Sequence, residues 1–296
     1  MVKSIGDDVV LLLTIFGSLA SIIAFGIYFL PQLNDQGSIG VLFLGIISLY
    51  FLGYNHYLIS KYRKRSRYAE VFDDLNVGFS QLHNIDRNED QTIELIIQKL
   101  SIMCDHVGSA FSRINGTKIG VCIKFLSTEN NRLIVQTLVR DQKSILNDRK
   151  TGTNDKTKHY LDLNSDFNFI YKNFDDDNID TTFYFENKLP ICKDYNNTRI
   201  NSNWLPKSKI NFFENWLRRK HWPLKYRSTI VVPIVPLIAD EQNQKSIRGF
   251  LCIDSPKEKS FFPDYDTHIL KGICDGLYNK LDKLDGLLKN QNNGSN

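Results

Sequence analysis

The chain has 296 residues, of which 42% are apolar and 24% are charged, and its formal net charge is +4. This length suits one domain of ordinary size with accessory segments and leaves no room for many parts. Five positive charges lie within residues 61–67, so the rest of the chain carries a formal net charge of −1. A global basic surface for a nucleic-acid polymer is therefore not indicated, and we expect no such partner.

The cysteines do not form a ligand or disulfide pattern. There are five of them, widely spaced, without a C-x-x-C motif or a Cys/His series. An odd number at such spacings argues against a disulfide scaffold or a structural zinc site and is typical of a reducing compartment. We therefore expect no metal site, and the sequence does not identify a cofactor. The positions are Cys104, Cys122, Cys192, Cys252 and Cys274.

Two uncharged apolar runs stand near the start of the chain, at residues 9–30 and at about residues 39–58. In helical form the first run covers roughly 33 Å, about the thickness of the hydrocarbon core of a bilayer. Because only a short polar turn separates the runs, they predict a transmembrane helical hairpin over residues 1–60, with the lipid bilayer as a partner. A cleaved signal peptide is the alternative, but the first run is longer than a usual signal-peptide core and a second run follows it at once.

The basic residues after the second run set the expected orientation. Residues 61–67 contain five lysines and arginines, whereas the turn between the runs carries only Asp35. Positive charge stays on the cytoplasmic side of a membrane. Both termini should then be cytoplasmic, and we expect a multi-pass protein of the cell inner membrane or the plasma membrane.

Residues 61–82 predict a basic juxtamembrane segment that continues as a helical connector. Its apolar positions are Tyr68, Phe72, Leu75, Phe79 and Leu82. Their spacing of alternately four and three residues forms a two-heptad seam, which could pair with its own copy or pack on the following domain. The apolar stripe at residues 277–288 could meet its copy in the same parallel arrangement, so we expect a homodimer.

Residues 83–288 predict one α+β domain. A helix is expected to begin near Asn88 or Asp90 and to end at Gly108. Strand patterns occupy residues 119–126, 132–139, 226–237 and 247–254. The first two are joined by a hairpin signal, and an amphipathic helix follows the last. This order predicts a central antiparallel sheet flanked by helices. Residues 289–296 predict a disordered tail.

Four segments resemble, in their order and spacing, those of GAF domains. Residues 227–234, RSTIVVPI, resemble the S-x-x-x-V-P strand of that family. Residues 248–254, RGFLCID, resemble its G-x-L strand, and residues 262–270 resemble the entry to its last helix. Residues 187–194, NKLPICKD, resemble the segment on the pocket side of the sheet.

This resemblance covers roughly residues 83–285 and implies a small-molecule pocket on one sheet face, under a roof formed here by residues 141–225. Aromatic side chains beside guanidinium groups in this roof could stack on a base and neutralise phosphate, so a nucleotide is one candidate ligand. The alternative is that residues 209–220 form a helix with buried aromatics and a solvated basic end. The expected ligand-binding residues are Asp194, Arg199, Trp204 and Arg227.

Known catalytic motifs are absent from the sequence. It contains no P-loop, no G-x-S-x-G and no H-E-x-x-H motif, so we expect no enzyme activity and no catalytic residues. Residues 187–188 match the start of the cyclic-nucleotide signature of phosphodiesterase GAF domains, but its later Phe and Asp-Glu positions are not matched. The Cys-His pair of bilin-binding relatives is also absent.

Two functional hypotheses follow. The leading one is a membrane-anchored, non-catalytic cytoplasmic sensor that binds a small molecule and signals to a separate output protein or to its own transmembrane helices. The alternative is a nucleotide-gated membrane effector whose hairpins oligomerise and disrupt the bilayer. A third class, an enzyme with a site that no motif reveals, has no supporting feature in the sequence.

The charge asymmetry around the second run generates a test of orientation. A reporter that is active only in the cytoplasm should be active when it is fused after Asn296, because the basic segment 61–67 stays on the cytoplasmic side. The control is the same reporter inserted into the turn at residues 31–38, where it should be silent. Activity of the turn fusion with a silent C-terminal fusion would refute the orientation.

Overall fold

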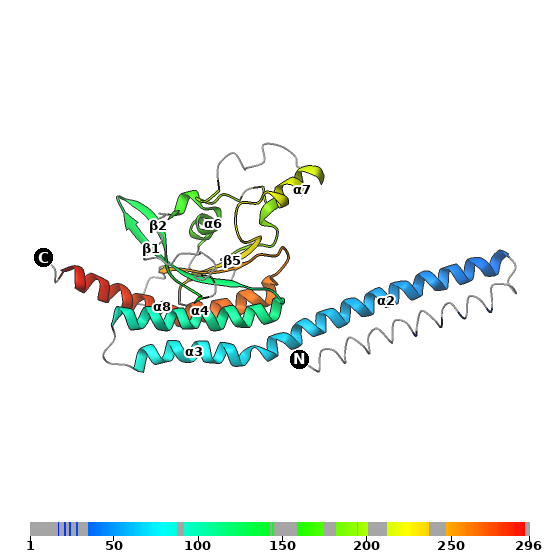
Figure 1. The fold of residues 1–296 in the computed structure, drawn as a ribbon, viewed down its shortest axis with the longest axis horizontal. Helices are drawn as coiled ribbons and strands as arrows, with labels where there is room; N and C mark the ends of the chain where they lie inside the picture. The colour runs from blue at the N-terminus through cyan, green and yellow to red at the C-terminus, as the bar shows by residue number, and fades with distance from the viewer. Residues whose placement is uncertain are drawn as a thin grey trace. The chain divides into compact units, whose positions relative to one another are not determined.

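The computed structural model describes residues 35–87, 92–142, 144, 159–174, 182–193, 195–200, 212–236 and 247–293, together with the single positions 17, 21, 24 and 28. The chain divides into two compact units, Met1–Ala69 and Glu70–Asn296. Every described strand belongs to the second unit (Figure 1).

The first unit is built around helix α2 (Asp35–Glu70), which includes the predicted second span at residues 39–58. Large apolar side chains of α2 are exposed, among them Leu49 and Tyr50. The predicted first span, residues 9–30, lies outside the described residues apart from the four single positions. Within the part of the chain that the structure describes, no helix has both the length and the apolar character needed to cross a membrane.

The second unit is an α+β domain built on one antiparallel sheet, as the sequence predicts. Its strands are β1 (Gly120–Glu129), β2 (Arg132–Arg140), β3 (His159–Tyr160), β4 (Tyr184–Glu186), β5 (Ser228–Ile234) and β6 (Gly249–Ser255). Among the described residues their order is β3-β2-β1-β6-β5-β4, and neighbouring strands are antiparallel throughout. Two three-stranded meanders are thus joined through the pairing of β1 with β6.

A turn of two asparagines closes the predicted hairpin between β1 and β2. Asn130 and Asn131 have φ values of +48° and +60°. Asparagine enters the left-handed region more readily than most residues, and two positive φ values match the twist of hairpin strands. The turn places Glu129 opposite Arg132 and so sets the register of the pair.

Helices α4 (Ile93–Asn115) and α8 (Pro263–Asn293) lie on one face of the sheet (Figure 1). The expected end of the first helix at Gly108 is wrong, because α4 continues to Asn115 and stops at Gly116, whose φ is +62°. A Cβ at Gly108 would lie 3.4 Å from the Ile119 carbonyl oxygen. The glycine therefore serves the close approach of helix and strand and does not end the helix.

The two ends of this helical layer also differ from the prediction. The Thr92 hydroxyl, rather than Asn88 or Asp90, caps α4 by accepting a hydrogen bond from Leu95 N at 3.2 Å. At the other end, α8 continues to Asn293, into the segment that the sequence predicted as a disordered tail. Lys289 pairs there with Asp285, one helical turn earlier, at 2.6 Å, which supports the last turns.

Helix α3 (Phe72–Arg87) packs on α4 and α8. Within one chain, the connector seam therefore packs on the domain that follows it. Leu75 and Leu82 are only 5% and 2% exposed. A Cβ at Gly276 of α8 would lie 3.2 Å from Leu82 Cδ1. Phe72, at the start of the seam, is exposed. These leucines pack on the domain, as the second of the two alternatives requires.

The opposite face of the sheet carries α6 (Ser165–Asn173), the 3₁₀ turns η2 (Leu161–Leu163) and η4 (Leu189–Ile191), and α7 (Phe212–Lys220) (Figure 1). Phe167 and Ile170 of α6 join an apolar cluster with Phe250 and Val231 of the sheet. The Phe167 and Phe250 ring centroids lie 4.9 Å apart. This cluster holds α6 over the sheet and leaves space beside it.

The close approach of β6 to β1 at Gly249 generates a stability prediction. A Cβ at this position would overlap the Lys124 carbonyl oxygen and lie 3.3 Å from Phe125 Cα. Both are backbone atoms of the central pairing, so Gly249→Ala should lower the free energy of unfolding by about 1–3 kcal/mol. Urea unfolding of the purified chain measures it.

The matched control is Gly286→Ala in α8, where a Cβ would meet nothing within 4 Å. Alanine favours a helix over glycine by roughly 0.5–1 kcal/mol, so this variant should be slightly more stable than the original chain. Equal stabilities of the two variants would show that β1 and β6 do not approach each other as described.

Candidate functional site

A cavity lies on the sheet face that α6 covers. It holds about 460 Å³ of empty space, part of which is open to solvent. Its lining includes Cys122, Lys124, Arg140, His159, Asn164, Asp166, Asn197, Arg199, Tyr226, Cys252 and Asp254.

The floor of the cavity follows from the alternation of side chains along paired strands. Cys122 and Lys124 come from β1, and Cys252 and Asp254 come from β6. Residues two apart on a strand point to the same face, and directly opposite residues share that face. Because Cys252 pairs with Cys122, the four side chains reach the cavity together.

Two cations lie at the floor of the cavity. Lys124 is 9% exposed and Arg140 is 4% exposed. Lys124 Nζ donates to Thr137 Oγ1 at 3.2 Å, and Arg140 Nη2 lies 3.4 Å from the same oxygen. Lys124 Nζ also stands 5.6 Å from the centre of the Phe167 ring. Strand pairing and α6 therefore hold both cations in place.

The carboxyl of Asp166, in the first turn of α6, is the most perturbed acid of the cavity. Burial raises the pKa of this carboxyl from 3.8 to about 7, although the Phe167 N–H, which donates to Oδ1 at 2.9 Å, and the charge of Lys124 oppose the rise. The other acid of the cavity, Asp254, accepts a hydrogen bond from the Thr229 hydroxyl at its Oδ1, at 2.8 Å.

Asparagine side chains fix the segment 195–200 at the rim. Asn164 Nδ2 donates to Thr198 Oγ1 at 2.7 Å, and Asn164 Oδ1 accepts from Thr198 N at 3.1 Å. Asn197 Oδ1 accepts from Arg199 N at 3.0 Å. These contacts hold the backbone at Arg199 while its side chain remains exposed at the cavity.

The structure brings one of the four predicted ligand-binding residues to the cavity. Arg199 lines it. Asp194 and Trp204 lie outside the described residues. Arg227 stands elsewhere, and its assignment to ligand binding stays a prediction that the cavity does not support.

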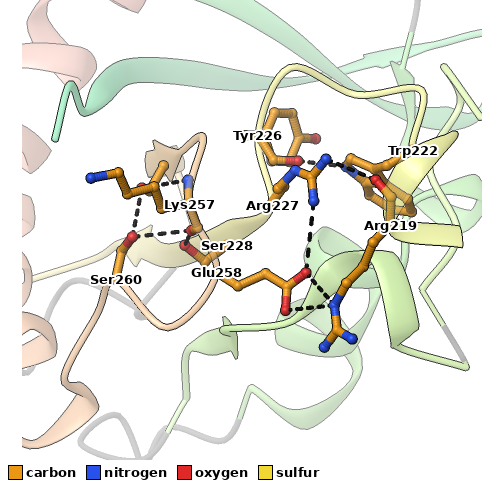
Figure 2. Close-up of polar contacts among 9 residues, drawn as sticks. Arg219, Trp222, Tyr226, Arg227, Ser228, Lys257, Glu258 and Ser260 are labelled. Atoms are coloured by element: carbon orange, nitrogen blue, oxygen red, sulfur yellow. Dashed lines mark hydrogen bonds and ion pairs between the residues drawn. The ribbon is translucent and has the colours of Figure 1, made fainter. Parts of the chain in front are cut away.

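Arg227 instead takes part in a polar network that holds the end of α7 (Figure 2). Arg227 Nη2 donates to the Arg219 carbonyl oxygen at 2.7 Å, and Arg227 Nη1 lies 3.8 Å from Glu258 Oε1. Arg219 Nε donates to both oxygens of Glu258, at 2.8 and 3.1 Å. The basic end of this helix is partly exposed, as the alternative of a solvated end requires, and Arg219 is also paired with Glu258.

Sequence reasoning missed the two floor cations and Asp166. A signal for Lys124 was present, because it is the one charged residue within the otherwise apolar run GVCIKFL. A charge in a strand that reads as buried marks a site or a paired group. Arg140 ends its strand and Asp166 looks like an ordinary first-turn acid, so neither had a comparable signal.

The chemistry of the lining favours an anionic or mixed-charge molecule over a metal ion. Lys124, Arg140 and Arg199 supply three cations, whereas Asp254 is joined by an Asp166 that burial keeps protonated below about pH 7. Among the residues that the structure describes, no group of three or more His, Cys, Asp and Glu side chains is arranged to hold a metal ion.

Comparisons with known proteins give similarities of fold at low identity. No protein-family model matches the sequence, and no curated protein matches it. Among solved structures, the GAF domain of an Acinetobacter phosphoenolpyruvate-protein phosphotransferase is 13% identical and aligns over 73% of this chain and 94% of that chain, with a TM-score of 0.43. A putative GAF sensor protein from Burkholderia vietnamiensis is 11% identical over 75% of this chain and 97% of its own, with a TM-score of 0.40.

The type II free methionine-R-sulfoxide reductase from Thermoplasma acidophilum is also similar, at 16% identity over 65% of this chain and 96% of its own, with a TM-score of 0.38. At these identities and TM-scores the similarities assign neither a ligand nor an activity.

The raised pKa of Asp166 predicts a pH-dependent contribution to stability. The neutral carboxyl stabilises the folded state fully below the unfolded pKa near 4, and this contribution is lost as pH rises through about 7. Asp166→Asn keeps an oxygen for the Phe167 N–H but stays neutral. Its free energy of unfolding relative to the original chain should therefore increase between pH 5 and pH 8, by ~1.4 kcal/mol for each pH unit from 5 up to the folded pKa of about 7.

Urea unfolding at the two pH values measures this difference. Asp73→Asn, at an exposed position of α3, is the control for adding an amide and should follow the original chain at both pH values. Parallel profiles of Asp166→Asn and the original chain would contradict the assignment.

Proposed function

We propose that this chain is a membrane-anchored sensor whose second unit binds a small anionic molecule in the cavity and signals to a partner protein or to its own N-terminal helices. The observation that carries the proposal is the presence of two buried cations, Lys124 and Arg140, in one cavity lining. The ligand is bound and released unchanged, so the chain acts without catalysis.

An anion has the charge that these two side chains can bind. Lys124 and Arg140 both reach the Thr137 hydroxyl, which accepts hydrogen bonds but carries no charge. A phosphate or carboxylate beside these two cations can accept a charge-assisted hydrogen bond from each of them.

The protonation state of Asp166 should affect the binding of an anion in this cavity. An anion near this carboxyl favours its neutral form, which can donate a hydrogen bond, whereas the ionised form repels the ligand. Binding should therefore weaken as the pH rises through about 7.

The membrane anchor in this proposal is supported by the sequence. Residues 9–30 are uncharged and long enough to span a bilayer, and the basic segment 61–67 follows the second apolar run. The exposed apolar side chains of α2, such as Leu49, Tyr50 and Phe51, need a non-aqueous or protein partner.

Mass spectrometry of small molecules released from the purified full chain tests the ligand class. The released molecule should carry a phosphate or carboxylate group. A neutral or purely cationic molecule in the cavity would refute the proposal.

Titration calorimetry tests the role of the buried cations. The probes are mononucleotides, cyclic nucleotides, inorganic phosphate and small dicarboxylates. For any anion that binds the original chain, Lys124→Met should lower the affinity at least about tenfold, which corresponds to ~1.4 kcal/mol, because it removes a desolvated charge. Lys283→Met, on the exposed surface of α8, is the control and should bind normally.

Unchanged affinity of Lys124→Met, with thermal unfolding showing a folded protein, would exclude the floor of the cavity as the binding site. Leakage of dye-loaded liposomes on addition of the same anion then separates the two outputs. The sensor proposal expects no leakage, and ligand-dependent leakage would instead support the membrane-effector hypothesis.

A further inference from the structure

Two cysteines face each other on the floor of the cavity. Cys122 of β1 and Cys252 of β6 are direct partners in the antiparallel register, with Val121 opposite Ile253 and Ile123 opposite Leu251 on either side. Both line the cavity and are only 2% and 4% exposed. Access to their sulfur atoms is therefore through the cavity.

The register places these residues within reach of a disulfide. Direct partners in an antiparallel pair have Cα atoms roughly 4.5 or 5.5 Å apart, according to whether the pair exchanges backbone hydrogen bonds. A disulfide needs Cα atoms about 4.4–6.8 Å apart, so either kind of pair meets the requirement. Both side chains lie on the same face of the sheet, as a bond between them demands. Both cysteines are free thiols in this structure.

The cavity also makes the two sulfur atoms chemically unequal. The Cys252 thiol donates a hydrogen bond to the Cys122 sulfur, and the positive charges of Arg140 and Lys124 add to its effect. Together these groups lower the pKa of Cys122 to about 6, against the opposing effects of burial and of the negative charge of Asp254. Burial and the thiolate of its partner raise the pKa of Cys252. These directions favour Cys122 as the nucleophile and Cys252 as the resolving thiol.

Simple packing accounts for only part of this arrangement. The two side chains join an apolar cluster with Phe250 and Val231, and buried cysteines often serve only as small apolar groups. Cys104 and Cys274 show that case, since burial raises the pKa of both thiols. Packing alone does not explain why Cys252 lies directly opposite Cys122 and why two cations lie beside the pair.

We propose that Cys122 and Cys252 form a peroxide-oxidisable dithiol, a modification site that closes reversibly into a disulfide between β1 and β6. The oxidant is hydrogen peroxide or another small hydroperoxide that enters through the cavity, and a dithiol reductant reopens the bond. The inference stands on the register and the cavity and does not depend on which ligand the cavity binds.

The chemistry balances in two steps. The Cys122 thiolate attacks one peroxide oxygen, the O–O bond breaks, and hydroxide leaves with the electron pair and takes a proton from solvent, which gives a sulfenic acid. The Cys252 sulfur then attacks the Cys122 sulfur, the S–O bond breaks, and the departing hydroxide takes the proton of the Cys252 thiol. Two thiols and one peroxide thus give one disulfide and two waters, with two electrons passing from sulfur to oxygen.

Closure of the disulfide changes the charge of the cavity floor. It removes the thiolate beside Lys124 and Arg140 and leaves their positive charges less compensated. The oxidised chain should therefore bind an anion more tightly than the reduced chain.

The test is oxidation of the full chain with hydrogen peroxide, followed by mass spectrometry. The intact mass should fall by two hydrogen atoms, and proteolysis should release one cross-linked peptide pair that joins Cys122 to Cys252. Dithiothreitol should restore the original mass. Cys192→Ser, which replaces the half-buried cysteine outside the cavity lining, is the control and should leave this cross-link unchanged.

Two variants test the assignment of roles. In Cys252→Ser the sulfenic acid has no resolving thiol, so dimedone should label Cys122 after peroxide treatment. In Cys122→Ser, dimedone should not label Cys252. The alkylation rate of Cys122 in the original chain should rise with pH and level off above about pH 7, because the thiolate is then fully populated.

A peroxide-treated original chain without the Cys122–Cys252 cross-link would overturn the proposal, whether or not the variants fold. Labelling of Cys252 instead of Cys122 would overturn the assignment of the nucleophile.

Discussion

The pairing of β1 with β6 decides which side chains meet in the cavity. Every described strand on one side of this pair belongs to the first meander, and every described strand on the other side belongs to the second. The register sets Cys122 against Cys252 and directs Lys124 and Asp254 to the same face. A slip of one residue would turn each of these side chains toward α4 and α8. The contact of Gly249 with the backbone of β1 opposes such a slip, because a Cβ at this position would overlap the Lys124 carbonyl oxygen.

The cavity brings together several buried ionisable side chains, each of which is costly to remove from water. Lys124 and Arg140 are cations out of water, Asp166 is an acid that burial keeps neutral below about pH 7, and Cys122 is an acidic thiol between them. Each group changes the protonation of the next, so their states are coupled through distances of a few ångströms. Such a cluster contributes little to stability, because desolvation offsets its internal attractions.

Local sequence signals predicted the fold well, and contacts between distant segments account for most of what they missed. The Asn130–Asn131 turn, the flanking strands and the last helix all follow from patterns within a few residues. By contrast, the partnership of Cys122 with Cys252 depends on a register that no local pattern records. Gly108 misled the prediction because its small size serves helix–strand contact, which is a tertiary requirement. The residues around Arg199 in the sequence were enough to predict that it lines the cavity. Arg227 pairs instead with Glu258, which lies in a later loop, and no local pattern indicates that contact.

The strand order also has a consequence for biosynthesis. The N-terminal meander can form as soon as β3 has left the ribosome, but β6, the last strand of the sheet in the chain, is the one that pairs with β1. Until β6 emerges, the nascent chain presents the unpaired edge of β1, an apolar strand that other chains could extend. Completion of the domain is thus a late, nonlocal event, and a slow one by the usual dependence of folding rate on sequence separation. During that interval the backbone groups along this edge of β1 have no strand partner within the sheet.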